Sequence, residues 1–194
     1  MTSTPVSLLD RLKRAGPDAV EWERVQQMYV PLVRRWLQDV PGLEDEIEDL
    51  SQEVFVVLLR ELPSFERRRE GSFRAWLRRV TVNRLRTQRK QRRRRPTTDG
   101  RADDEAVLSQ LEDPHSRLSQ AWDREHDRHV FRQLLAAIAP EFNAVDQAAF
   151  RRFAVDGLSA AATALELGIS ENSVLLAKSK ILKRLRLEAA GLID

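Results

Sequence analysis

A dense run of basic side chains is the feature of this sequence best suited to binding chemistry. Residues 60–95 hold 15 Lys and Arg against 3 Asp and Glu, whereas residues 1–59 and 96–130 each carry a net charge of −5. Guanidinium groups pair well with phosphate oxygens. A net charge of +12 over 36 residues therefore indicates a polyanionic partner, and we favour nucleic acid over a merely solvated helix face.

A second candidate binding element lies near the C-terminus, in LSAAATALELGISENSVLLAKSKILKRLR. Ser159 and Ser170 are suited to cap two helices, and Gly168 to make the turn between them. This spacing is typical of a helix-turn-helix, whose second helix enters the major groove of DNA, although an ordinary antiparallel helix pair is the alternative. The arc expected to pack inward holds Val174, Ala177, Ile181 and Leu185. The residues expected to face DNA are Asn172, Ser173, Leu176, Ser179, Lys180 and Lys183.

The remaining polar clusters do not indicate catalysis. His126 and His129 would share a helix face with Asp123 and Asp127, which is a possible metal site. No enclosing apolar shell is evident, so we interpret this stretch as a solvated linker helix and predict no metal and no cofactor. The acidic cluster at 44–53 lacks the glycine and spacing of a calcium loop, and no catalytic triad or phosphate loop is found. We therefore expect a protein that is not an enzyme.

Composition narrows the class of protein further. Hydrophobic residues make up 42% of the 194 residues, which is enough to form real cores. There is no cysteine, so disulfides and thiolate zinc sites are excluded and a cytoplasmic location is expected. No apolar run reaches the roughly 20 residues of a membrane span, and no signal peptide is recognised.

The elements that must position these residues are expected to be helices throughout. Seven glycines and one tyrosine argue against an all-β protein. Apolar residues at spacings of three and four predict helices, and Pro31 is expected to kink or split the first of them. Ser72 is predicted to cap the third helix, with Phe73 and Trp76 on its core side. The predicted helices span 19–40, 43–62, 73–95, 116–139, 141–157, and two short segments from 158 onward.

The charge pattern also predicts the domain organisation. We expect an all-α protein with two small helical domains, at 1–96 and 126–194. A flexible acidic linker is expected at 97–125, with a short helix near 106–111. The acidic linker would not follow the same polyanion, which explains why the basic run stops at its border.

At this point two segments resemble a known family. DLSQEVF (49–55) followed by FRAWLRRVTVNRLR (73–86) resembles region 2 of bacterial RNA polymerase sigma factors of the extracytoplasmic-function type, in the sigma-70 family. The segment at 157–186 resembles their region 4. The resemblance implies binding to the β and β′ subunits of core RNA polymerase and to the minus-ten and minus-35 elements of promoter DNA. It also admits an anti-sigma protein as a partner.

The resemblance assigns roles residue by residue. The positions that resemble polymerase contacts are Asp49, Gln52, Glu53 and Arg60. Those that resemble contacts to minus-ten DNA are Ser64, Phe65, Ser72, Arg74, Arg79, Asn83, Arg86, Arg89, Lys90, Arg92 and Arg93. Asn83 is favoured for base contacts and the later basic residues for phosphates. Many family members carry Lys and Arg where this chain has Leu175, Leu176 and Ala177, and Leu176 can meet thymine methyl groups instead.

Two other functions remain as alternatives. A free-standing helix-turn-helix regulator of duplex DNA would explain the C-terminal motif but not the paired segments at 49–55 and 73–86. An adaptor that binds RNA or acidic partners through the arginine run would leave Lys180 and Lys183 dispensable. The sigma factor is the hypothesis that uses all of these features.

Overall fold

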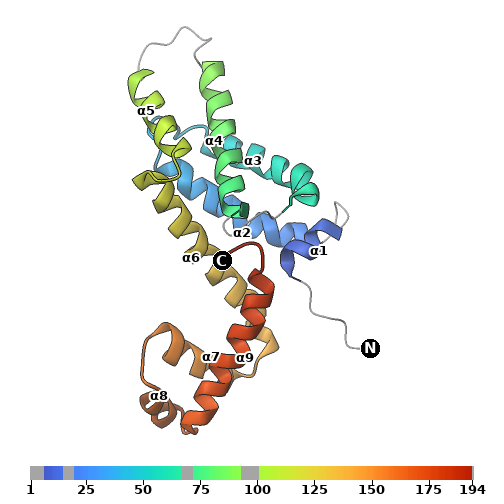
Figure 1. The fold of residues 1–194 in the computed structure, drawn as a ribbon, viewed down its shortest axis with the longest axis vertical. Coiled ribbons are helices and arrows are strands. Elements are labelled where there is room, and N and C mark those ends of the chain that lie inside the picture. Colours follow the sequence, from blue (N-terminus) through green and yellow to red (C-terminus); the bar gives the residue numbers. More distant parts are fainter. Residues whose placement is uncertain (1–6, 15–19, 67–71, 93–100, 194) are drawn as a thin grey trace. The chain divides into compact units, whose positions relative to one another are not determined.

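The computed structural model describes residues 7–14, 20–66, 72–92 and 101–193, and all regular structure among them is helical. This confirms the predicted all-α class. The helices, drawn in Figure 1, are α1 (Leu8–Arg14), α2 (Val20–Gln38), α3 (Ile47–Glu61), α4 (Ser72–Arg92), α5 (Arg101–Glu112), α6 (Arg117–Ile138), α7 (Ala144–Phe150), α8 (Ala160–Leu167) and α9 (Glu171–Ala189). None of the described helices is both long and apolar enough to cross a bilayer.

The chain forms two compact units, whose main segments are Leu8–Val130 and Phe131–Ala190. We call them the N-terminal unit and the C-terminal unit. Within the N-terminal unit, α2 packs on α3, α3 on α4, and α4 on α5. Within the C-terminal unit, α7 and α8 both pack on α9.

Helix α2 runs unbroken through Pro31, so Pro31 does not split it. Proline removes the hydrogen bond that would reach the carbonyl group of Gln27. Pro31 and Gln27 both lie on the exposed side of the helix, where water can satisfy that carbonyl. The opposite side of α2 supplies large buried side chains, among them Trp22, Tyr29 and Trp36.

The first half of α6 completes the core of the N-terminal unit. Trp122 is buried and stacks on Trp36, with ring centroids 4.7 Å apart and planes 6° from parallel. His126 is fully buried beside the rings of Tyr29 and Phe73. The interpretation of this stretch as a solvated helix was therefore wrong, because its buried positions recur at helical spacing toward α2 and α4. Helix α5 and the start of α6 also lie inside the stretch predicted as linker.

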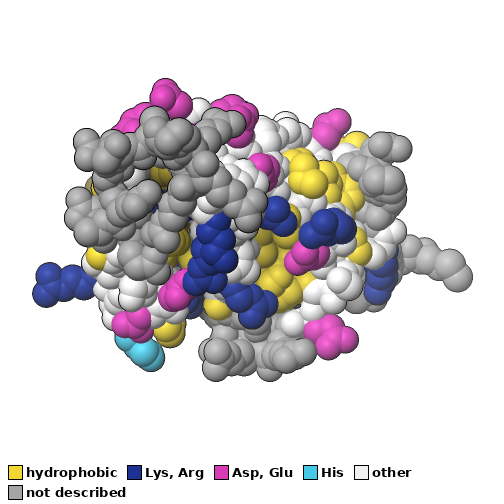
Figure 2. Space-filling view, turned by 90° about the horizontal axis from the view of Figure 1, so that it is seen from above, with side chains coloured by type: hydrophobic (Ala, Val, Ile, Leu, Met, Phe, Trp, Pro, Cys, Tyr) yellow, Lys and Arg dark blue, Asp and Glu magenta, His cyan; other side chains and the backbone are white. Residues whose placement is uncertain are grey.

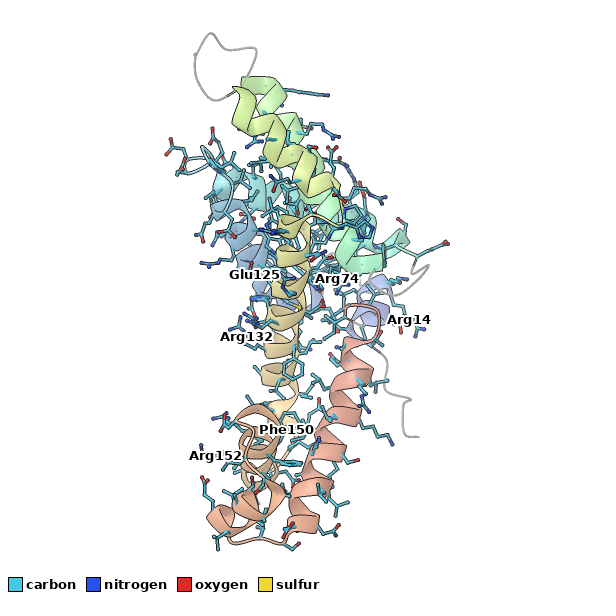
Figure 3. The ribbon with its side chains drawn as sticks, turned by 60° about the vertical axis from the view of Figure 1, so that its left-hand side comes forward. Arg14, Arg74, Glu125, Arg132, Phe150 and Arg152 are labelled. Atoms are coloured by element: carbon cyan, nitrogen blue, oxygen red, sulfur yellow. The ribbon has the colours of Figure 1, made fainter. Side chains whose placement is uncertain are left out.

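The C-terminal unit is built around small side chains. Ala149, Ala164, Val174 and Ala177 form its buried cluster, with Phe153, Leu167 and Ile169 packed around it. A short 3-10 turn (Ala139–Glu141), α7 and a π-helical turn (Arg151–Val155) replace the single helix predicted at 141–157. Figure 3 shows Phe150 pointing into this unit and Arg152 on its outside.

Helices α8 and α9 and the turn between them form as their capping residues predict. The Ser159 hydroxyl accepts a hydrogen bond from the backbone N–H of Ala162 at 3.1 Å, and Ser170 accepts one from Ser173 at 3.1 Å. Gly168 ends α8 at a φ of 64°, in the left-handed region that disfavours side chains. The arc predicted to pack inward is confirmed by the burial of Val174, Ala177, Ile181 and Leu185.

Candidate nucleic-acid interface

Helix α4 presents one row of polar side chains to solvent. The row recurs at spacings of three and four residues, so its members share one face of the helix. It consists of Arg79, Asn83, Thr87 and Lys90, all exposed. Three of the residues predicted to contact minus-ten DNA, Arg79, Asn83 and Lys90, therefore lie together. This row combines an amide suited to base edges with cations suited to phosphates.

The inner face of α4 holds arginines that are already paired within the chain. Arg74 pairs with Asp127 and, at 3.6 Å from its Nε, with Asp123. Arg78 pairs with the same Asp123 and donates to the backbone carbonyl of Ser119 at 3.4 Å. Arg74 and Asp127 belong to α4 and α6, respectively, and Figure 3 shows Arg74 lying beside α6. Two arginines four residues apart thus face two aspartates four residues apart.

The burial of this network indicates that it stabilises the fold. The side chain of Arg78 is only 9% exposed, and a buried guanidinium without a carboxylate partner is costly. Further along the helix, Arg86 pairs with Glu112 of α5, and Arg89 is buried. Figure 2 shows basic side chains lying directly beside acidic ones on the face that it draws. Arg74, Arg86 and Arg89 were predicted to contact DNA, and the structure turns them toward the chain itself.

The network left a signal in the sequence that was missed. The 74/78 pair of arginines and the 123/127 pair of aspartates have the same spacing of four, which suits a series of ion pairs between two helices.

The structure describes some of the other predicted residues only in part. Ser72, predicted to cap this helix, is the first residue of α4. The side chains of Ser72 and Arg92, and all of Arg93, lie outside the described residues.

The segment before α4 is held by an aromatic cluster. The ring of Phe65 lies 5.6 Å from that of Phe73 and 5.3 Å from that of Trp76. Phe73 and Trp76 are buried, which confirms their predicted core position, whereas Phe65 is partly exposed. Ser64 is exposed and its hydroxyl donates to the carbonyl of Glu61 at 3.0 Å. Ser64 and Phe65 thus lie at the surface beside the start of α4.

The four residues that resemble polymerase contacts lie together on α3. Asp49, Gln52, Glu53 and Arg60 line a depression of about 430 Å³, together with Val56, Val57 and Arg84. Val56 is 58% exposed, whereas most of the apolar side chains of α3 are buried. Hydrogen bonds from Gln52 and from Arg34 lower the pKa of the neighbouring Glu48. The sequence analysis missed Val56 and Arg84.

Comparison with known proteins identifies the segment that carries both the depression on α3 and the polar row on α4. Residues 25–95 match the family model of sigma-70 region 2. This matched segment makes up 71 of the 194 residues and is similar to region 2 of the sigma-70 family. No curated protein and no solved structure matches the chain. Region 2 of these sigma factors binds core RNA polymerase, so the match supports a role in promoter recognition with that enzyme. The match ends before α5, and the first half of α6 is thus an addition to the matched region.

The C-terminal unit exposes the outer face of α9. Every residue predicted to face minus-35 DNA is exposed on α9: Asn172, Ser173, Leu176, Ser179, Lys180 and Lys183. The Nζ of Lys180 lies 3.7 Å from Asp146 of α7, and the Nζ of Lys178 lies 4.8 Å from the ring centre of Phe153. The cations therefore begin only after the first two turns of α9.

An apolar cavity lies elsewhere in the C-terminal unit. It measures about 180 Å³ and its apolar lining includes Leu135, Ile138, Phe142, Phe150, Val155 and Ile181. In the same unit, Arg184 of α9 makes two bonds to Glu141, of 2.7 and 2.8 Å, and one of 2.8 Å to buried Glu188. Hydrogen bonding to Glu141, above all, raises the pKa of Arg184. The cavity could accept a short apolar segment of a partner.

Proposed function

We propose that this protein is a sigma factor of the extracytoplasmic-function type, which binds core RNA polymerase and directs it to promoters. The observation that carries the proposal is that the segment matching region 2 presents two separate faces, an acidic and apolar one on α3 and a basic row on α4. Its length of 194 residues suits this small type. In this proposal polymerase performs the chemistry, and the chain is not an enzyme.

The α3 face is the proposed contact with the β′ subunit. Its carboxylates, Asp49 and Glu53, suit a basic partner, and Val56 offers an apolar centre. Interfaces of this kind place an apolar anchor inside a ring of polar groups. Arg60 and Arg84 supply the opposite charge at the rim of the same depression.

The α4 row is the proposed contact with melted minus-ten DNA. Arg79 and Lys90 would bind phosphates and Asn83 a base edge, since unpaired bases expose donors and acceptors that an amide can match. Ser64 and Phe65 lie before the start of this helix and would meet a base turned out of the stack. Arg92 and Arg93 would continue the phosphate contacts. Arg74, Arg86 and Arg89 would instead support α4 from its inner side.

The C-terminal unit is the proposed duplex-binding part. Helix α9 would enter the major groove of the minus-35 element, and Lys180 and Lys183 would contact phosphates. The apolar cavity beside Phe142 and Phe150 is the proposed seat for the β flap. An anti-sigma protein would have to cover one of these faces. The protein would then act in the cytoplasm, together with polymerase.

Co-elution with purified bacterial core RNA polymerase tests this function. We expect the full chain to co-elute, and Val56→Asp to reduce the complex at least tenfold, because a charge would be buried at the centre of the interface. The matched control is Val20→Asp, which changes another exposed valine of the same unit, 71% exposed, and should co-elute normally. Tight duplex binding by the chain alone without co-elution would overturn the proposal in favour of a free-standing regulator.

A second experiment separates DNA melting from polymerase binding. Asn83→Ala should lower the fraction of open complexes, measured by permanganate reactivity of unpaired thymines, and leave co-elution unchanged. Val20→Ala, at an exposed position of α2 outside this row, is the control and should leave both open complexes and co-elution unchanged. If Asn83→Ala lowered co-elution equally, Asn83 would serve the fold or the polymerase contact instead.

A further inference from the structure

The outer face of the recognition helix has an apolar centre. Leu175 and Leu176 are 48% and 49% exposed, and residues 171–177 include no Lys or Arg. Base readout by a guanidinium or ammonium group on guanine, the commonest specific contact in the major groove, is therefore not offered by the first two turns of α9. Something else must supply specificity there if this helix reads DNA.

The fold fixes which way Leu176 points. Val174 is fully buried, and Leu176 follows it by two residues, which is about 200° around the helix axis. Buried Ala177 and Ile181 confirm that the inward arc stays on the other side along the helix. Leu176 therefore lies at the middle of the outer face.

The immediate neighbours of Leu176 are polar. Side chains three and four residues away are adjacent on a helix surface. Around Leu176 these are Asn172, Ser173, Ser179 and Lys180, all exposed. An amide and two hydroxyls flank the leucine, and Lys183 extends the basic side one turn further. A purely apolar protein groove would leave these groups without partners, whereas a DNA groove offers base edges and phosphates to each of them.

We propose that Leu176, with Leu175 beside it, reads the 5-methyl group of thymine in the major groove. The minus-35 element of this sigma factor would then be specified by thymines opposite Leu176, with Asn172 matching adenine. This inference rests on the proposed function, because it assumes that α9 binds duplex promoter DNA. The thymine methyl is the one apolar group that a base pair presents in that groove, and a leucine side chain can bury it.

Removing the methyl group alone tests the contact. Holoenzyme assembled from the full chain and core polymerase would select its minus-35 element from a pool of randomised duplexes. Each thymine of the selected duplex would then be replaced by deoxyuridine, which lacks only the methyl group. We expect binding to weaken about fourfold at one or two positions, as for the loss of one buried methyl or methylene group.

A double-mutant cycle assigns the effect to the leucine. With Leu176→Ala the same uridine substitutions should have no effect, because the partner of the methyl group is gone. The matched control is Leu165→Ala, which truncates another exposed leucine, 86% exposed, on α8 rather than on the recognition helix. It should retain the full sensitivity to uridine.

The outcomes separate this inference from the function beneath it. If holoenzyme selects an element but uridine changes nothing, or if Leu176→Ala keeps the sensitivity, the thymine contact is overturned and the sigma-factor function stands. If Leu176→Ala lowers co-elution with core polymerase and leaves the uridine effect intact, the leucine is a protein contact and the inference also fails. If no duplex is enriched by the holoenzyme, both proposals fail.

Discussion

The two units of this protein differ in the cluster at the centre of their cores, which is aromatic in one and made mostly of alanine in the other. The N-terminal unit stacks Trp36 on Trp122 and surrounds His126 with further rings. The C-terminal unit closes around Ala149, Ala164, Val174 and Ala177. Large rings hold a distant helix such as α6 in place, whereas alanines let α8 and α9 approach closely. In the C-terminal unit, larger apolar side chains of α8 and α9 remain exposed to solvent.

Both units contain a buried charge that is paired. The N-terminal unit buries Arg78 against Asp123 and keeps His126 inside its core. The C-terminal unit buries Glu188 against Arg184 and carries further ion pairs at its surface, such as those of Arg152 with Asp156 and Glu166. Substitutions that shrink a large aromatic side chain should therefore damage the first unit most, and substitutions that enlarge a small side chain should damage the second.

The largest effect should come from Trp122→Ala. Truncating a large aromatic side chain in a core costs about 3–5 kcal/mol of unfolding free energy. Amide hydrogen exchange of α2 and α6 in the full chain would measure the loss. Val20→Ala, at an exposed position, should change the exchange by less than about 0.5 kcal/mol. Equal protection in Trp122→Ala and in the wild type would mean that the first half of α6 is not part of this core.

A smaller loss is expected from Asp123→Asn. The change removes the charge that Arg74 and Arg78 share, and a hydrogen bond to a charged group contributes about 1.5–3 kcal/mol. The same exchange measurement applies. Arg78→Met combined with Asp123→Leu should recover much of the loss, since an apolar pair can replace a buried ion pair. If the double variant did not recover this stability, the network would stabilise the fold by more than the mutual neutralisation of its charges.

The converse test enlarges the small core. Ala177→Leu should destabilise the C-terminal unit by about 1–3 kcal/mol through overpacking. Exchange of the α8 and α9 amides would report it. Ala161→Leu places the same side chain on the exposed side of α8 and should be nearly neutral. A neutral Ala177→Leu would show that this core has room to spare, contrary to the comparison.

The smallest effect concerns pH. Burial lowers the pKa of His126 below its ordinary value of 6.5, although Asp127 and Asp123 oppose the shift and Arg74 adds to it. The unfolded chain then binds the proton first, so stability falls as the pH drops below about 6.5, by at most about 1.4 kcal/mol per pH unit. Urea unfolding of the full chain at pH 5.5 and 7.5 would show this difference. His126→Phe should show less of it, and an unchanged difference would exclude His126 as its source.

Periodicity predicted most of the fold because it reports which side of a helix is buried. The caps at Ser159 and Ser170 and the inward arc of α9 follow from residue types that have one favourable position. The site was harder to predict. Arg74, Arg79 and Arg86 have the same type and lie on one helix, yet Arg74 and Arg86 pair with acids of α6 and α5 whereas Arg79 is exposed.

Whether an arginine of α4 faces solvent depends on the acidic residues of the helix that packs against it. An arginine can bind phosphate or an aspartate of its own chain, and residue type alone does not distinguish the two. Asp123 and Asp127 decide the matter here, although the polar composition of their segment indicated a solvated linker. Trp122 and His126, four residues apart in the same segment, together indicated that one face of this helix is buried.

The placement of the tryptophans has an optical consequence. All four, at positions 22, 36, 76 and 122, and the single tyrosine belong to the N-terminal unit, whereas the C-terminal unit has neither residue type and does not absorb appreciably near 280 nm. Intrinsic fluorescence of the unlabelled chain therefore reports on one unit alone. The parallel indoles of Trp36 and Trp122 should couple their transitions, so near-ultraviolet circular dichroism can follow the seating of α6 while polymerase or DNA is added.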